Sequence, residues 1–414
     1  MYTQPTHLFS VPLSTSNLID EQDPKPNVPP KLTAVYEGAR SEAIRVARPL
    51  VPELDDLVPM LQDIFDRRWL TNNGPYLKKL EAALTTELGV LDLAVVTNGT
   101  CALEMCLRAL HLEPGEVITT GFSFPATWHC ILDQPGLTPR FADIGPDYGL
   151  SPEAVAAAIT PQSRAILAVH TYGYPAEVEA LQRIADDHRL PLIYDAAHAF
   201  GVEVNGRSIA QWGTLSAFSF HATKGFNTLE GGCVAGPEQS GDSLKRLRLD
   251  RNFGIINPDE IVSVGRNGKM DEVRAAIGLL VLKKVPELLE RRAAVVRRYL
   301  DWFSERSDPT VEVRAHQYAR SDRKLNFGYF PVRVRPKGRR TRDSVVAAME
   351  KNGVFARKYF YPSVTTAPLY EDLFEPGSLP ETASASQEVL CLPLHHELSA
   401  EDLDRVLAAF GDAL

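Results

Sequence analysis

Apolar and polar positions alternate in two distinct ways along the chain from about residue 50. Short runs rich in apolar residues, typical of strands buried on both faces, recur between longer stretches with helical spacing. The expected strands lie at 91–97, 116–120, 138–144, 164–170 and 191–197. The expected helices lie at 54–65, 101–112, 151–159 and 177–189. This alternation predicts an α/β fold with a mostly parallel sheet covered by helices.

The pattern also predicts how the chain is divided. Residues 1–45 are rich in proline and polar residues, which predicts an extended or disordered arm. Residues 46–275 hold the alternating strands and helices and are expected to form a large domain. Residues 276–414 are expected to supply bridging helices, interrupted near Pro286, and a smaller α+β domain with a strand-like stretch at 325–334.

Composition narrows the function. The 414 residues carry a formal net charge of -9, which gives no general support for nucleic-acid binding. No apolar stretch reaches the roughly 18–20 residues of a membrane helix, and no basic-then-apolar leader opens the sequence, so neither a membrane span nor a secretory signal is expected. The five cysteines lack CxxC or metal-ligand spacing, which predicts free thiols in a reducing cytoplasm and no metal site.

The turn after the expected strand at 91–97 reads Asn98-Gly99-Thr100. A glycine and a hydroxyl residue at the start of a helix expose backbone N–H groups that can bind a phosphate. Taken alone, the same turn is also an ordinary tight connection between a strand and a helix.

A second group of residues favours a more specific interpretation of this turn. Asp195 lies near the end of a buried strand, where an acid either caps a helix or holds a proton on the pyridine nitrogen of pyridoxal phosphate. Lys224, in "SFHATKGFNTLEGG" (219–232), is either a surface lysine or an amine that attacks a carbonyl. Phe124 can cover a cofactor ring. A phosphate turn, an aromatic, an acid and a lysine at strand ends together predict a pyridoxal 5′-phosphate site.

These motifs resemble those of the DegT/DnrJ/EryC1/StrS sugar aminotransferases. The resemblance covers about 50–414 and rests on "NGTCALEMCLRAL", "PLIYDAAHAFG", "SFHATKGFNTLEGG" and "GRNGKM" (265–270). It implies the fold-type-I pyridoxal-phosphate aminotransferase architecture and a homodimer with shared active sites. The large domain at 46–275 would then be the cofactor-binding domain.

The resemblance also implies roles for single residues. Lys224 and Asp195 match the catalytic pair, the lysine that attaches the cofactor and the acid beside its ring nitrogen. The implied cofactor contacts are Gly99, Thr100, Phe124, Asp195, His198, Ser219, Lys224 and Asn267, the last reaching the neighbouring subunit's phosphate. The candidate substrate contacts are Asn73, His221, Tyr359 and Tyr361, although core packing explains the two tyrosines equally well and a structural role suits the histidine.

The resemblance finally implies a reaction. Amino transfer from L-glutamate to a dTDP-4-keto-6-deoxyhexose, giving dTDP-4-amino-4,6-dideoxyglucose, is the expected activity. Amination at C3 of a dTDP-3-keto sugar, or of a cyclitol ketone, is the alternative within the family. A pyridoxal-phosphate lyase or a non-catalytic regulator with the same fold is the alternative outside it. Because Lys224 is present where a sugar-dehydrating branch has histidine, dehydration is disfavoured.

Overall fold

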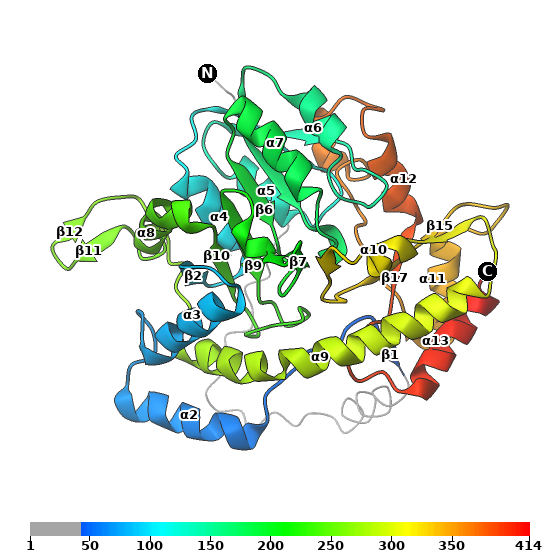
Figure 1. Cartoon of the computed structure of the whole chain (residues 1–414), viewed down its shortest axis with the longest axis horizontal. Coiled ribbons are helices and arrows are strands. Elements are labelled where there is room, and N and C mark those ends of the chain that lie inside the picture. Colours follow the sequence, from blue (N-terminus) through cyan, green and yellow to red (C-terminus); the bar gives the residue numbers. More distant parts are fainter. Residues whose placement is uncertain (1–42) are drawn as a thin grey trace, which may run out of the picture. The chain divides into compact units, whose positions relative to one another are not determined.

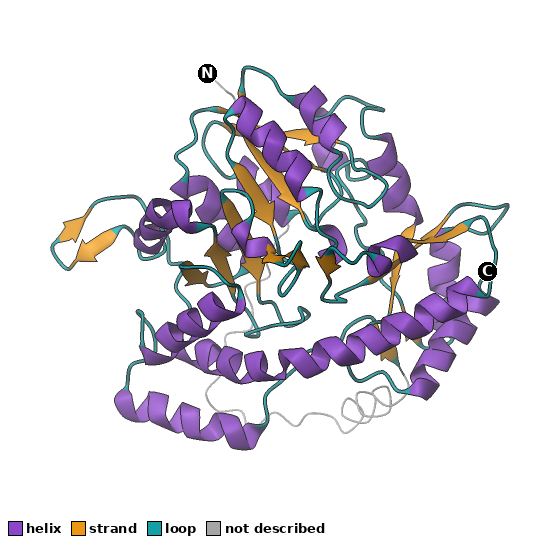
Figure 2. Ribbon diagram, viewed as in Figure 1, coloured by secondary structure: helices purple, strands orange, loops and turns teal. Residues whose placement is uncertain are grey.

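A seven-stranded sheet carries the candidate site in the computed structural model, which describes residues 43–414 (Figures 1 and 2). Its spatial order is β2 (Leu93–Val96), β10 (Gly232–Ala235), β9 (Leu215–Ser219), β6 (Leu192–Asp195), β5 (Ser163–Val169), β3 (Gly115–Thr120) and β4 (Leu137–Ala142). β10 is antiparallel to both of its neighbours, and the other neighbouring strands are parallel. The mostly parallel sheet predicted from the sequence is confirmed.

Helices cover both faces of this sheet. Along β2, Leu93 and Val95 point into one apolar cluster, whereas Ala94 and Val96 point into the other. One face is covered by α4 (Gly99–Ala109), α5 (Ala126–Leu132) and α8 (Gly241–Asp250). The other is covered by α2 (Leu54–Arg67), α3 (Pro75–Glu87), α6 (Pro152–Ala158), α7 (Val178–His188) and the first half of α9 (Glu272–Ser304). The two-sided cover explains why the strands have continuous apolar runs.

Helix α9 connects the large sheet with a separate apolar cluster in the C-terminal region. Its first half packs on the large sheet, and its second half contributes Val295, Val296 and Tyr299 to another cluster. The predicted interruption near Pro286 is wrong, because α9 runs through this residue without a break. A proline costs a helix one hydrogen bond and a steric contact with the preceding turn. The buried neighbours Val285 and Leu288 provide packing that keeps the helix continuous.

The second core belongs to a smaller sheet with the order β13 (Val311–Val313), β15 (Phe330–Val334) and β17 (Val389–Leu392). It packs with α11 (Arg342–Lys351) and α13 (Ala400–Asp412), which begin with capping boxes at Thr341 and Ser399. The strand expected at 325–334 is half as long as predicted, because only Phe330–Val334 form β15 and the residues before them are irregular. The predicted α+β region is present, and the division at residue 275 stays a prediction because it falls inside α9.

The expected arm lies outside the described residues as far as residue 42. Its last two residues form β1 (Ile44–Arg45), which pairs in parallel with β16 (Val354–Phe355). The remaining elements of the described residues are β7 (Glu203–Val204), β8 (Arg207–Ser208), β11 (Ile255–Asn257), β12 (Glu260–Ile261), α10 (Ala315–Ala319), β14 (Arg323–Lys324), α12 (Pro380–Glu388) and four short 3-10 turns. No helix within 43–414 has the length and apolar character needed to cross a bilayer.

Candidate active site

The turn between β2 and α4 lies directly against the end of β9. A Cβ atom on Gly99 would lie 2.7 Å from the Cβ atom of Ser219, so only glycine allows this approach. The side chain of Asn98 accepts a hydrogen bond from the backbone N–H of Cys101 at 2.8 Å. The N–H groups of Gly99 and Thr100 have no hydrogen-bond partner within the described part of the chain. A helix N-terminus and a serine hydroxyl therefore meet at one point, as a phosphate site requires.

Asp195 is the last residue of β6, and its side chain is buried. One carboxylate oxygen accepts a hydrogen bond from Thr127 Oγ1 at 2.8 Å, and the other accepts one from the backbone N–H of Ala197 at 3.0 Å. Burial raises the pKa of Asp195, while these hydrogen bonds and the nearby Lys224 oppose that rise. A partly compensated buried carboxylate is suited to pairing with a cationic group that is absent from the protein itself.

His198 follows Asp195 in the turn after β6. Its ring stacks on Phe360, with ring centroids 5.5 Å apart, and meets the edge of Tyr329 at 5.0 Å. Its Nδ1 atom is buried and has no hydrogen-bond partner among the described residues. Burial and the charge of Lys224 hold the pKa of His198 well below its usual range. The neutral ring therefore presents an unused polar atom beside Lys224.

Lys224 lies in the loop between β9 and β10. Its Nζ atom donates a hydrogen bond to Tyr329 Oη at 3.2 Å. Burial lowers the pKa of Lys224 to about 8, although the negative charge of Asp195 opposes this shift. Near neutral pH a minority of molecules therefore carry a neutral amine, the form that a nucleophile and proton acceptor needs. The sequence-based choice of a reactive rather than a surface lysine fits these surroundings.

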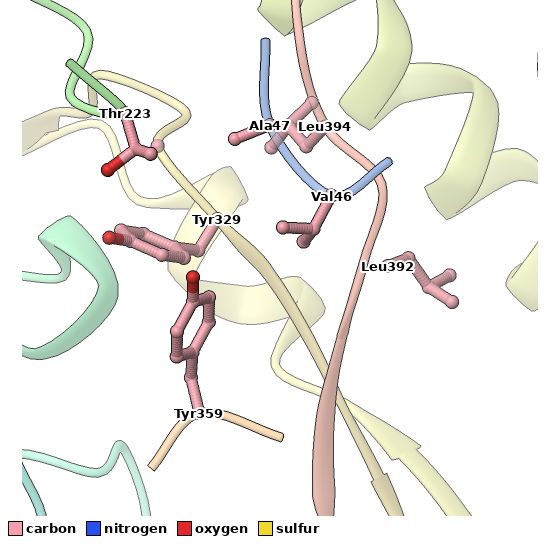
Figure 3. Close-up of a pocket in the computed structure, with 8 residues that line it drawn as sticks. Val46, Ala47, Thr223, Tyr329, Tyr359, Leu392 and Leu394 are labelled. Atoms are coloured by element: carbon pink, nitrogen blue, oxygen red, sulfur yellow. The ribbon is translucent and has the colours of Figure 1, made fainter. Parts of the chain in front are cut away.

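The loop 356–362 brings two predicted substrate contacts to the same side of the site. Tyr359 meets the ring of Tyr329 with centroids 5.6 Å apart, and Figure 3 shows these two rings beside Thr223 and Val46. Tyr361 is exposed and lines a groove of about 400 Å³ together with Tyr359 and Phe124. Phe124 is 62% exposed, so its ring is free to cover a bound group. The stacking role of Phe124 stays a prediction.

Three other predicted contacts are not gathered with these groups. Asn73 is exposed just before α3. His221 is exposed and contacts its own loop, with Nδ1 2.9 Å from Thr223 Oγ1 and Nε2 3.6 Å from Glu230. Asn267 is exposed beside Gly268, whose backbone carbonyl accepts a hydrogen bond from the N–H of Thr97. Their substrate and cofactor roles stay predictions.

Sequence reasoning did not find two residues that contact the predicted catalytic pair. Thr127 bonds Asp195 across 68 positions of sequence, and Tyr329 bonds Lys224 across 105. Thr127 does stand three residues after Phe124, one turn along the same segment. No local signal marks Tyr329, which lies in an apolar, strand-like stretch typical of a core.

The side chains present fit pyridoxal 5′-phosphate. The approach of Gly99 to Ser219 leaves a cradle that a single Cβ atom would fill. The buried carboxylate of Asp195 suits a ring nitrogen that carries a proton, and the orphaned Nδ1 atom of His198 lies in the same region. The low-pKa amine of Lys224 suits an aldehyde. The donor set therefore meets each part of the cofactor with a matching group.

Comparison with known proteins agrees with this fit. Residues 54–411 match the DegT/DnrJ/EryC1/StrS aminotransferase family model. The chain is 38% identical over 368 residues to a dTDP-4-amino-4,6-dideoxy-D-glucose transaminase of Escherichia coli, which covers 87% of this chain and 96% of that protein. It is also 38% identical to the Shigella dysenteriae protein of the same name, over 89% of this chain and 98% of that one.

A solved structure gives the same answer for the fold. DesI, crystallised in the presence of its TDP-sugar product, superposes with a TM-score of 0.81 and 34% sequence identity. The superposition covers 91% of this chain and 94% of DesI. The fold-type-I architecture expected from the sequence is therefore confirmed over nearly the whole described chain.

Proposed function

The chain belongs to the DegT/DnrJ/EryC1/StrS aminotransferase family, and we propose that it transfers an amino group from L-glutamate to C4 of dTDP-4-keto-6-deoxyglucose. The product is dTDP-4-amino-4,6-dideoxyglucose. The observation that carries the proposal is Lys224, a low-pKa amine near a buried acid, within a chain 38% identical to transaminases named for this product. The enzyme is an aminotransferase that depends on pyridoxal 5′-phosphate.

The protein's own residues divide the work. The cofactor, when bound, supplies an aldehyde that carries the amino group and a ring that withdraws electrons. Asp195 holds the proton on the ring nitrogen, and Gly99, Thr100 and Ser219 bind the phosphate. Lys224 takes the proton from the α-carbon of glutamate in the first half-reaction and delivers a proton to C4 of the sugar in the second. 2-Oxoglutarate leaves between the two halves, which makes the reaction ping-pong.

The nucleotide sugar is proposed to enter through the groove lined by Phe124, Tyr359 and Tyr361. This groove has about 400 Å³ of space, which is within the range of small-molecule sites. Arg357 and Lys358 also line it together with Glu350, which leaves a net positive charge for a ligand that carries two phosphates. Aromatic rings and cations in one groove suit a sugar attached to a nucleoside diphosphate.

A homodimer with shared sites is part of the proposal. The hairpin of β11 and β12 projects from the rest of 44–414 and carries exposed apolar side chains (Figure 1). Ile261 is 72% exposed and Val264 is 84% exposed, a few residues before Asn267. Apolar residues that a single chain leaves in water favour burial against a second copy.

The cytoplasm is the proposed location. All five cysteines are buried and free of disulfides, which suits a reducing compartment.

The test is a direct assay of the purified protein with pyridoxal phosphate, glutamate and a panel of dTDP-4-keto and dTDP-3-keto sugars. We expect 2-oxoglutarate in amounts that match a C4-aminated product identified by NMR. A C3-aminated product, or activity with a cyclitol ketone alone, would replace the proposed substrate. Cleavage of an amino acid without transfer of its amino group would indicate a lyase. A protein that binds the cofactor but turns over no substrate would indicate a regulator.

A further inference from the structure

Tyr329 connects the small sheet region to the reactive lysine. It lies immediately before β15 and its hydroxyl contacts the Nζ atom of Lys224 at 3.2 Å. No other hydrogen bond to this Nζ atom is formed by residues 43–414. The ring of Tyr329 is also 5.8 Å from the ammonium, which adds a weaker cation–π attraction. The position of the lysine amine therefore depends on a residue about a hundred positions further along the chain.

The ring of Tyr329 is held from several sides. Its centroid is 5.0 Å from His198, 5.6 Å from Tyr359 and 5.8 Å from Tyr172. Its backbone carbonyl accepts a hydrogen bond from Tyr318 Oη at 3.2 Å. These contacts come from four separate segments of the chain, so the hydroxyl has a fixed direction. A fixed hydroxyl can hold a flexible lysine side chain at one point.

We propose that Tyr329 is the positioning residue that holds the Lys224 amine in place while it takes a proton from glutamate in one half-reaction and delivers a proton to the sugar in the other. The inference rests on the proposed function, which requires Lys224 to be free of the cofactor during each proton transfer. Between transfers the side chain would otherwise sample many rotamers. The hydrogen bond to Tyr329 keeps Nζ within reach of the reacting carbon.

A phenol suits both protonation states of the amine. A charged ammonium donates to the phenol oxygen, and a neutral amine accepts from the phenol O–H. The pKa of Lys224 is lowered to about 8 by burial, so both states occur near neutral pH. Burial raises the pKa of Tyr329, so the phenol itself stays protonated and does not lose its proton to the lysine amine. One contact therefore serves before and after proton transfer.

Other titratable groups also face Lys224 and set the background for its pKa. They are Asp195 at the end of β6, His198 in the next turn, Arg292 on α9 and Tyr359 in the loop 356–362. Arg292 is buried, and one of its terminal nitrogens is 3.2 Å from the position of a Cβ atom on Gly225. A change at Tyr329 leaves all of these groups in place. Its effect on Lys224 is therefore separable from theirs.

The first measurement uses protein freed of cofactor. The reactivity of the Lys224 amine is followed by pulse labelling with acetic anhydride at different pH values and peptide mass spectrometry. We expect Tyr329→Phe to lower the pKa of Lys224 by about one unit. The variant loses a hydrogen bond that is stronger with the charged ammonium than with the neutral amine. Tyr148→Phe is the matched control, because it removes a buried phenol whose hydroxyl has no hydrogen-bond partner among the described residues and does not contact the lysine.

The second measurement is the loss of the α-deuteron from labelled glutamate by the complete enzyme, followed by NMR. We expect Tyr329→Phe to slow this step about tenfold to a hundredfold and to shift the acid limb of its pH profile downward. An unchanged Lys224 pKa together with an unchanged pH profile would overturn the proposal, whatever happens to stability. The labelling needs no sugar, so a wrong keto sugar in the proposed function leaves this outcome intact.

Discussion

Thr127 Oγ1 donates a hydrogen bond of 2.8 Å to the buried carboxylate of Asp195. The two residues lie on α5 and at the end of β6, and the same threonine hydroxyl is 2.8 Å from Ser123 Oγ. The hydrogen bond favours the charged form of Asp195, against the effect of burial. Thr127 would therefore act on the cofactor through Asp195, the acid proposed to bind its ring nitrogen.

Thr127→Val should weaken cofactor binding. The valine fills the same volume and removes the hydroxyl, so the charged carboxylate loses one hydrogen bond worth roughly 1.5–3 kcal/mol. We expect the Kd for pyridoxal phosphate to rise by about one to two decades, measured by equilibrium dialysis. Thr127→Ser keeps the hydroxyl and should bind normally. Equal affinity in the valine variant and the wild type would show that this bond does not support Asp195.

Gly99→Ala should damage the phosphate cradle. The added Cβ atom would lie 2.7 Å from a side-chain carbon of Ser219, which is too close for two non-bonded carbon atoms. The turn must move away from β9, so we expect at least a tenfold loss of cofactor affinity, roughly the effect of one lost hydrogen bond to a charged group.

Gly241→Ala supplies the matched control. Gly241 also begins a helix, and nothing lies within 4 Å of its added Cβ atom. This variant should bind pyridoxal phosphate as the wild type does. Normal binding by Gly99→Ala would mean that the phosphate is bound elsewhere.

The proposed cofactor pair could be predicted from the sequence because each member has a local signal. Lys224 and Asp195 stand at strand ends, and the parallel strands that carry such ends bring them to one edge of the sheet. Gly99 and Ser219 could be predicted from the sequence for the same reason. The structure adds the distances and the burial that shift the pKa values of Lys224 and Asp195.

The remaining members of the site have no such signal. Tyr329 contacts Lys224 only because the segment before β15 packs against the turn after β6, and sequence spacing carries no record of that packing. The unbroken course of α9 through Pro286 is a tertiary effect of the same kind, because buried neighbours outweigh a local preference. The role predicted for Asn267 is a contact with the phosphate of a neighbouring subunit, and it stays a prediction.

Asp195→Asn should stabilise the cofactor-free protein while it impairs catalysis. Burial raises the pKa of Asp195 in the folded state above its unfolded value. Such a group stabilises the fold at low pH, and that contribution is lost as the pH rises through the folded pKa. Asparagine carries no charge, so the free energy of unfolding should exceed that of the wild type at pH 7. The difference should shrink as the pH falls toward about 4.

Urea unfolding of the cofactor-free proteins across this pH range measures the difference. Asp187→Asn, an exposed change on α7 with the same loss of charge, controls for net charge and should show no such trend. A variant at Asp195 that is less stable than the wild type at pH 7 would contradict the account of a costly buried carboxylate.

The shared active site can be tested by mixing two inactive proteins. Lys224→Ala removes the reactive amine, and Asn267→Asp places a negative charge where the neighbouring subunit's phosphate is proposed to lie. In a mixed dimer with shared sites, one site carries both changes and the other carries neither. Random exchange should therefore restore at most about a quarter of the wild-type activity, because half the dimers are mixed and each has one intact site.

A second mixture tests whether activity returns whenever two inactive variants exchange subunits. Lys224 and Asp195 lie in one chain's site, on the loop after β9 and at the end of β6, and their charges interact directly. A mixed dimer of Lys224→Ala with Asp195→Asn then has one change in each site and no intact site, so no activity should return. If exchange is confirmed by mass and the mixture of Lys224→Ala with Asn267→Asp also stays inactive, Asn267 serves its own chain's site and the shared-site proposal is wrong.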